Sequence, residues 1–132
     1  MKADDTTLAR VRATLDRMAE AYRGRRLDTL IDCFVDDPDV SLIGTAADEQ
    51  RFGRAAIRQQ AERDWSQTEA IALETGSLAV SAAGGVAWAF VDGAFRMRAG
   101  GGEQVLPARI TYVLVEREGD WKIAHAHFST PL

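Results

Sequence analysis

Two histidines, His125 and His127, are the only ones in the chain and lie two residues apart near its C-terminus. In a β-strand, residues two apart face the same side, so both imidazoles would share a side with Trp121, Ile123 and Ser129. Imidazole is the side chain whose unperturbed pKa lies closest to neutrality. The pair could transfer protons or contact a ligand, bind a metal, or form structural hydrogen bonds. Because two ligands are too few and no third is apparent, we expect no metal site.

A carboxyl group lies in line with two large aromatic side chains in a second stretch. If residues 86–98 form a strand, Trp88, Phe90 and Asp92 face one side. If that side faces a pocket, burial would raise the pKa of Asp92 and suit it to general acid or base catalysis. The alternative is that Asp92 lies at a twisted strand end, where it is solvated or bound to a backbone amide.

The elements that must position these residues follow from the spacing of apolar side chains. Apolar residues at spacings of three and four predict a helix from Leu8 to Tyr22, ended by Gly24. The same pattern predicts a short helix over Leu27–Phe34 and a third helix from Gly53 to Ser66. Stretches rich in Val, Ile, Thr and aromatic residues predict strands over 40–44, 71–75, 77–81, 86–98, 104–117 and 121–129.

Helices first and strands afterwards predict an α+β domain, with three N-terminal helices on one face of a curved antiparallel sheet. Short glycine-containing turns favour antiparallel pairing of neighbouring strands. In residues 109–117, both sides of the predicted strand are largely apolar. Helices can cover only one face of the sheet, so we expect a second copy of the chain to cover the other. The sequence therefore predicts a homodimer through the sheet.

Composition limits the classes of function. A chain of 132 residues fits a single domain, residues 1–132, and its net charge of −4 with a pI of about 5.1 argues against nucleic acid. No apolar run reaches the roughly 18 residues that a membrane span requires, so no membrane partner is expected. The single cysteine, Cys33, excludes an intrachain disulfide and suits a cytoplasmic location.

Two stretches carry a resemblance to a known family: residues 107–131, from Pro-Ala-Arg-Ile-Thr-Tyr to His-Ala-His-Phe-Ser-Thr-Pro, and residues 43–57. They resemble the SnoaL-like branch of the nuclear-transport-factor-2-like superfamily, and the order of the helices fits as well. The C-terminal end is also similar to the association domain of calmodulin-dependent kinases, which ends in His-x-His-x-Ser. Where those kinases can carry an arginine, this chain has Phe128, so their anion-binding arrangement is not carried over.

The resemblance implies a cone-shaped, strongly curved antiparallel sheet closed by the helices around a central pocket, usually in a dimer. It also implies that Arg109 lies near the two histidines. There it could grip a carboxylate or enolate with paired hydrogen bonds, or form a structural salt bridge with Asp92. Large aromatic residues are the expected walls of the pocket, or else plain core: Tyr22, Phe34, Phe52, Trp65 and Trp88.

The fold serves isomerases, cyclases, dehydratases, epoxide hydrolases and binding modules, so fold alone does not decide the chemistry. The sequence favours a domain that binds a small apolar or carboxylate-bearing organic molecule, because no motif secures a base and a group that orients it. The alternative is a cofactor-free isomerase or cyclase that moves a proton next to a carbonyl. In that case Asp92 or a histidine would be the base, and Arg109 or Tyr22 would stabilise the oxyanion. We expect no cofactor.

Overall fold

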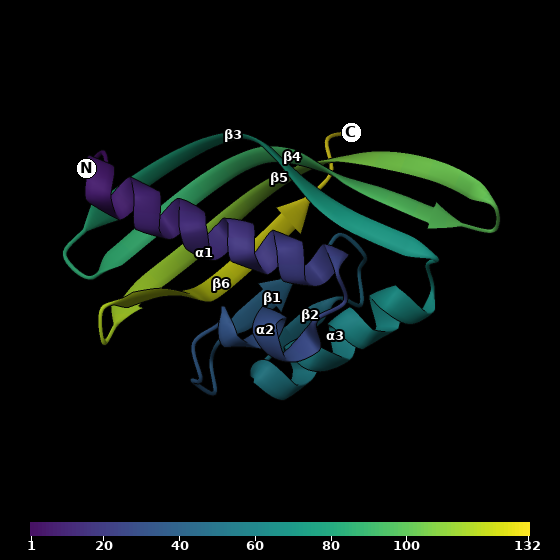
Figure 1. Cartoon of the computed structure of the whole chain (residues 1–132), viewed down its shortest axis with the longest axis horizontal. Coiled ribbons are helices and arrows are strands. Elements are labelled where there is room, and N and C mark those ends of the chain that lie inside the picture. Colours follow the sequence, from purple (N-terminus) through teal and green to yellow (C-terminus); the bar gives the residue numbers. More distant parts are fainter.

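The structure, a computed structural model, describes residues 1–132 as three helices and six strands (Figure 1). The helices are α1 (Asp5–Arg23), α2 (Leu27–Asp32) and α3 (Arg54–Ser66). The strands are β1 (Ser41–Ile43), β2 (Gln50–Phe52), β3 (Ala70–Ala83), β4 (Val86–Ala99), β5 (Gly102–Arg117) and β6 (Asp120–Ser129). They form one sheet in the order β2-β1-β6-β5-β4-β3. The predicted α+β class is confirmed.

The sheet is mixed rather than wholly antiparallel. Ser41 in β1 is paired with His125 in β6, and these two strands run parallel, whereas every other pair of neighbouring strands is antiparallel. A parallel pair needs a long crossover connection. Here α3 and the meander of β3, β4 and β5 supply it, since they separate β1 from β6 along the chain. The predicted antiparallel pairing is therefore present throughout the sheet except between β1 and β6.

Helix α1 lies across the sheet and covers one face of it (Figure 1). The side chain of Asp4 caps its N-terminus by accepting a hydrogen bond from the amide of Thr7 at 2.8 Å. Its buried side consists of Val11, Leu15, Met18, Ala21 and Tyr22. Because this stripe recurs every three to four residues, packing it against the sheet gives the helix its position and buries the centre of the core.

Helix α2 is shorter than the predicted Leu27–Phe34. After Asp32 the chain leaves the helix and runs beside β6. The amide of Ile123 donates to the carbonyl of Cys33 at 2.8 Å, and the amide of Val35 donates to the carbonyl of Ile123 at 2.9 Å. These two bonds compete with a further helical turn, and they place Phe34 against the sheet rather than on a helix.

A bend in β3 and β4 curves the sheet around the helices. Strand β3 is continuous through an irregularity between Thr75 and Ser77, where the sequence predicts two separate strands. Gly76 lies against the carbonyl oxygen of Asp92, and Gly93 lies against that of Glu74, so closely that a Cβ at either glycine would overlap the oxygen. Glycine at these two positions lets the strands approach and bend. The bend turns the start of β3, the end of β4 and the start of β5 toward α3, and side chains of all three segments line one cavity with those of α3.

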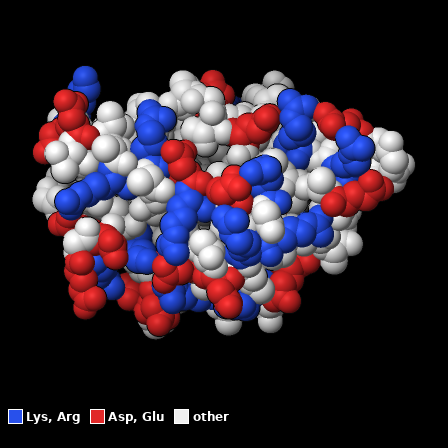
Figure 2. Space-filling view, in the orientation of Figure 1, with Lys and Arg blue, Asp and Glu red and all other residues white.

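The face of the molecule that carries α1 is polar and mixed in charge. Figure 2 shows Lys and Arg intermixed with Asp and Glu over the face that carries α1, without a broad patch of one sign. None of the three helices combines the length and the apolar composition needed to cross a lipid bilayer.

Candidate functional site

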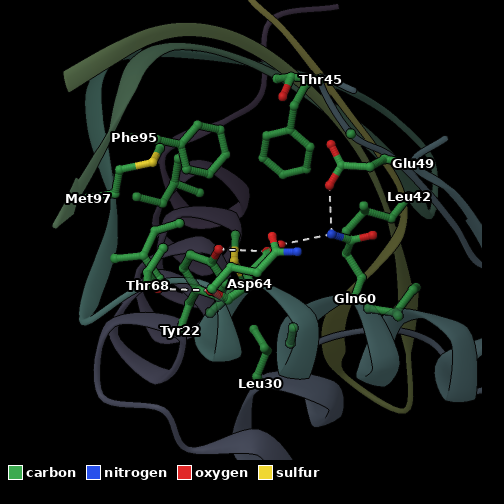
Figure 3. A pocket seen from close by; sticks show the side chains of 18 of the residues that line it. Tyr22, Leu30, Leu42, Thr45, Glu49, Gln60, Asp64, Thr68, Phe95 and Met97 are labelled. Atoms are coloured by element: carbon green, nitrogen blue, oxygen red, sulfur yellow. Dashed lines mark hydrogen bonds between the residues drawn. The ribbon is translucent and has the colours of Figure 1, made fainter. Parts of the chain in front are cut away.

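A cavity of about 210 Å³ lies between the three helices and the bent end of the sheet (Figure 3). Twenty residues line it, and 13 of them are hydrophobic. The apolar walls come from α1 to α3, the chain after α2, and every strand except β2: Met18, Tyr22, Leu30, Phe34, Leu42, Ile57, Ala61, Ile71, Leu73, Phe95, Met97, Leu106 and Phe128. The remaining lining residues are polar or glycine: Gly44, Thr45, Glu49, Gln60, Asp64, Gln67 and Thr68.

Four polar side chains form a hydrogen-bonded cluster at one wall of the cavity, which we call the acidic cluster: Tyr22, Glu49, Gln60 and Asp64 (Figure 3). The Tyr22 hydroxyl donates to Asp64 Oδ2 at 2.8 Å. The Gln60 amide nitrogen donates to Asp64 Oδ1 at 2.8 Å and to Glu49 Oε2 at 2.6 Å. Both carboxyl groups are thereby tied to the same amide, which fixes their positions relative to each other.

Local structure explains why these side chains meet. Gln60 and Asp64 are four residues apart in α3 and so lie on the same side of that helix. Glu49 is brought back to the cavity by the loop after β1, in which the amide of Gly44 donates to its carbonyl at 2.8 Å. The amide of Ala46 then holds the carboxyl group itself, at Oε1, with another bond of 2.8 Å.

Trp65 contacts Tyr22 on the side away from the cavity and fixes its orientation. The Trp65 indole donates from Nε1 to the carbonyl of Tyr22 at 3.1 Å. The two rings also pack against each other with centroids 6.0 Å apart. Tyr22 therefore enters the cavity in one orientation, with its hydroxyl directed at Asp64.

Burial raises the pKa of two members of the cluster, Asp64 and Tyr22. It raises the pKa of Asp64 above its ordinary value of 3.8, and the nearby Glu49 carboxyl acts in the same direction. The hydrogen bonds from Tyr22 and Gln60 oppose this rise because they favour the charged form. Burial, followed by the charge of Asp64, also raises the pKa of Tyr22. Tyr22 therefore stays protonated as a donor, and Asp64 is a carboxyl group whose proton affinity is increased.

Of the five aromatic residues predicted as pocket walls, the structure places two in the cavity. Tyr22 and Phe34 line it, and Trp65 packs behind Tyr22 without lining it. Phe52 lies in the edge strand β2 with 61% of its surface exposed. Trp88 lies in β4, on the face of the sheet turned away from α1, and is half-buried there. For these two residues the predicted position in the pocket is wrong.

The four predicted catalytic residues lie together, but on that same outer face rather than in the cavity. Asp92 in β4 is directly opposite Arg109 in β5, and no ion pair joins them. His125 and His127 follow on β6 with their rings in an edge-to-face arrangement at 6.2 Å. These residues are therefore neighbours on the outer face, and their predicted position in the pocket is wrong.

On this face His125 has a structural contact. Its Nδ1 and the hydroxyl oxygen of Ser41 are 2.7 Å apart, across the parallel pair of β1 and β6. Burial, together with the neighbouring His127, lowers the pKa of His125. A neutral imidazole hydrogen-bonded to a serine fits the structural alternative that the sequence leaves open.

A β-bulge explains why the histidines face outward. In β5 and β6, Leu114 pairs with Ile123 but Val113 pairs with His125, so Ala124 is an extra residue without a partner. One extra residue reverses the alternation of sides along the strand. Ile123 is fully buried under the helices, whereas His125 and His127 are turned to the other face.

In β4, side-chain size decides which residues face α1. Ala87, Ala89 and Val91 are the buried residues of this strand, and the larger Trp88 and Phe90 point outward. Small side chains let the helix approach the sheet closely. Asp92 shares the outer side with Trp88 and Phe90, as the alternation of the strand requires.

The sequence does not single out Gln60 and Asp64, and for Glu49 it favours a solvated loop position over a place at the mouth of a pocket. One signal could have found two of them. Ile57 and Ala61 mark the apolar side of α3, and Gln60 and Asp64 fall on that same side at helical spacing. Polar residues on the buried side of a helix are candidates for function. The structure brings no three His, Cys, Asp or Glu side chains together as a metal site.

Solved structures of the same shape come from several bacteria. An NTF2-like protein of unknown function from Pseudomonas putida shares 26% identity, covers 100% of this chain and 91% of its own, and has a TM-score of 0.80. A protein described as a "putative dehydratase from the NTF2-like family" of Streptomyces avermitilis has a TM-score of 0.89 at 18% identity, over 98% of this chain and 99% of its own.

A third structure is described as a "putative calcium/calmodulin dependent protein kinase II association domain" from Xanthomonas campestris. It has a TM-score of 0.80 at 23% identity, over 92% of this chain and 85% of its own. The curated proteins give no match.

The family assignment rests on the sequence and agrees with these structures. The model of the SnoaL-like domain matches residues 11–132, which include the whole cavity. The high TM-scores show the NTF2-like fold. The chain therefore belongs to the SnoaL-like domain family of the nuclear-transport-factor-2-like superfamily.

Proposed function

We propose that the cavity binds a small, largely apolar organic molecule whose polar group lies beside Asp64. One observation carries this proposal: an apolar cavity of about 210 Å³ has its acidic side chains gathered in a single hydrogen-bonded cluster. Small-molecule sites are typically concave and apolar, with a few convergent polar groups. A dry cavity of about 150 Å³ is large enough for benzene, so this one has room for a substituted ring.

Ligand-induced thermal stabilisation tests the proposal with two matched variants. Ala61→Leu adds three carbon atoms to a buried wall of the cavity, and Asp92→Asn changes the outer face instead. One- and two-ring aromatic compounds are screened against all three proteins. We expect the wild type and Asp92→Asn to gain several degrees in Tm with the same compounds, since a ligand at a hundredfold its Kd contributes about 2.7 kcal/mol.

Ala61→Leu should respond to none of these compounds. Loss of response in Asp92→Asn, with response retained in Ala61→Leu, would place the site on the outer face and contradict the proposal. Circular dichroism of each variant shows whether it is folded.

A second candidate function is acid–base catalysis, which the raised pKa of Asp64 favours. A carboxyl group with increased proton affinity suits proton removal from a carbon next to a carbonyl. In that step the C–H bond breaks, the proton goes to an Asp64 oxygen, and the electron pair moves into the enolate. Dehydration next to a carbonyl can begin in the same way, and one structural neighbour is described as a "putative dehydratase".

Hydrogen exchange at carbon tests this second function without knowledge of the substrate. Phenylacetone and 2-tetralone are incubated in D₂O with the protein, and NMR follows deuterium entering next to the carbonyl. We expect the wild type to accelerate exchange and Asp64→Asn to lose at least about a hundredfold of that acceleration. Glu62→Gln, an exposed position in α3, serves as the control. Equal exchange with wild type and Asp64→Asn would leave binding as the function.

We also propose that the outer face of the sheet is covered by a second copy of the chain. Large hydrophobic residues are exposed there, with Phe90 at 45% and Val86 at 40%, next to the half-buried Trp88. A monomer would leave these side chains in water. Their neighbours across β5 and β6, including Val113 and His125, continue the same face. Light scattering after size exclusion should give the mass of a dimer at micromolar concentration.

A cytoplasmic location completes the proposal. Cys33 is buried as a free thiol, and burial raises its pKa. Thiols stay reduced in the cytoplasm. Fractionation of cells that express the protein at its native level would check this location.

A further inference from the structure

The acidic cluster offers acceptors and no free donor among its own side chains. The single hydroxyl hydrogen of Tyr22 goes to Asp64. Both amide hydrogens of Gln60 are used as well, one on Asp64 and one on Glu49. Each carboxylate oxygen can accept more than one hydrogen bond, so Asp64 and Glu49 keep accepting capacity. A ligand that reaches this wall must therefore supply the donor.

The cavity also lacks any positive charge. Its 20 lining residues include two acidic side chains and no Lys, Arg or His. The two arginines that influence the cluster are engaged elsewhere. Arg63 pairs with Asp48 at 3.0 Å, and Arg25 donates to the carbonyl oxygens of Trp65 and Thr68 at 3.0 and 2.9 Å. A carboxylate ligand would therefore meet two carboxyl groups without a cation to offset them.

The orientation of Gln60 shows how firmly the cluster holds its donors. Gln60 is 5% exposed, and its Oε1 is buried without a hydrogen-bond partner. An unpaired buried acceptor costs free energy. Turning the amide over would give that oxygen a new environment, but it would also direct an acceptor at Asp64 and Glu49. The two carboxyl groups therefore dictate the orientation and keep both amide hydrogens.

We propose that the cavity recognises its ligand through a hydrogen-bond-donating head group, a protonated amine or a hydroxyl, which Asp64 and Glu49 accept. The ring or chain that carries this group packs against the apolar walls formed by Phe95, Met97 and Leu73. This inference rests on the proposed binding function and adds the chemistry of the ligand. It favours the apolar ligand expected from the sequence over the carboxylate-bearing one.

A set of compounds that differ only in the head group tests the inference on the wild-type protein. Benzylamine, benzyl alcohol, ethylbenzene and phenylacetate share one aromatic ring and carry an ammonium, a hydroxyl, a methyl group and a carboxylate. Kd values are measured by NMR titration at pH 7 and constant ionic strength. We expect the amine and the alcohol to bind more tightly than ethylbenzene, and phenylacetate to bind most weakly. The affinity for benzylamine should exceed the affinity for phenylacetate by about tenfold or more.

Two variants assign the preference to the cluster. Asp64→Asn and Glu49→Gln each replace a carboxyl group by an amide of the same shape, which removes charge and adds a donor. Each substitution should raise the Kd of benzylamine by roughly tenfold and leave the Kd of ethylbenzene within about twofold of the wild-type value. Each should also lower the Kd of phenylacetate. Glu62→Gln, which makes the same change at an exposed position of α3, should alter none of these values.

The outcomes separate this inference from the function on which it rests. Equal affinities for all four compounds, or tightest binding of phenylacetate, would overturn the donor requirement while the apolar binding site stood. An amine preference that survives both substitutions would overturn the role of Asp64 and Glu49. If none of these compounds, and none of the aromatic compounds in the thermal screen, binds to the wild type, both proposals are wrong.

Discussion

Asp64 and Asp48 show how two carboxyl groups in one short region acquire opposite properties. Asp64 lies at the cavity wall, where burial raises its pKa above 3.8. Asp48 lies on the surface, where its hydrogen bond to Arg63 lowers its pKa below the same value. Because both residues are aspartates, the difference in pKa comes from how well each carboxyl group is solvated and from its hydrogen-bond partners. It provides an internal control for the electrostatics of the site.

The pH dependence of stability should therefore differ in sign between two variants. A carboxyl group with a raised folded pKa contributes most below its unfolded pKa, and that contribution is lost as pH rises through the folded value. Relative to the wild type, Asp64→Asn should gain stability as pH rises from below 3.8 toward neutrality. Asp48→Asn should lose stability over the lower part of that range, because the charged Asp48 stabilises the fold above its folded pKa.

Urea denaturation at a series of pH values measures both curves against the wild type. If Asp64→Asn follows the same trend as Asp48→Asn, burial does not raise the pKa of Asp64, and the case for its acid–base role is lost.

At the scale of the elements, sequence patterns predict the order of the fold well. The helices over residues 5–23 and 54–66 and the strands of the meander follow from their apolar spacing and glycine turns. What the patterns cannot give is the side of the sheet that each strand residue faces. In β6 one unpaired residue, Ala124, reverses the alternation, and nothing in its neighbours marks it as a bulge. For that reason the prediction that His125 and His127 face the pocket is wrong.

The location of the cavity was also beyond the reach of local patterns. It depends on the bend at Gly76 and Gly93, which is a contact between two strands rather than a property of either. Tyr22 and Phe34 could be predicted as walls because they are large and lie on the apolar sides of the two predicted N-terminal helices. Asp64 could not be identified as a member of the cluster from local sequence, because only the folded chain brings α1, α3 and the loop at Glu49 together.

The bulge leads to a comparison of two deletions. Removing Ala124 leaves Ile123 inward and His125 outward, since it removes only the residue that has no partner. Removing the fully buried Ala126 instead forces an imidazole into the core, or Phe128 out of it. We expect the first deletion to keep the fold, and the second to cost at least about 1–3 kcal/mol more, because an imidazole would be buried without partners.

Urea denaturation of the two deletion variants compares their stabilities, and NMR spectra show whether each is folded. Equal destabilisation by the two deletions would contradict this account, because it would mean that stability does not depend on which β6 residues face the core.

A second prediction at this scale concerns the bend. Gly93→Ala should destabilise the protein by about 1–3 kcal/mol, since the new methyl group meets the carbonyl oxygen of Glu74 and the strands must separate. Gly102→Ala is the matched control, because its nearest neighbour, the carbonyl oxygen of Ala99, would lie 3.9 Å from the new methyl group. Thermal unfolding of both variants measures the difference. Equal effects would mean that close approach of β3 and β4 is not required.

At the scale of the whole molecule, the two faces of the sheet have different proposed roles. One face meets the helices and lines the cavity. The other carries Trp88, Phe90 and the two histidines, and we propose that it meets a second copy. The residues first considered catalytic would then belong to the subunit interface.

A charge placed at the centre of the outer face should separate the subunits. Phe90→Glu puts a carboxylate among apolar side chains that face the second copy, and burying an unpaired charge there is costly. We expect this variant to have the mass of a monomer by light scattering where the wild type is a dimer, with an unchanged circular dichroism spectrum. A wild-type protein that is monomeric, or a variant that stays dimeric, would contradict the proposed interface.

The most direct test of the central claim is an NMR map of the binding site. Benzylamine is titrated into ¹⁵N-labelled protein, and the changes in backbone amide shifts are assigned to residues. We predict that the largest changes lie around Gln60, Asp64 and Phe95, on the walls of the cavity. Changes centred on Trp88, His125 and His127, on the other face of the sheet, would contradict the account.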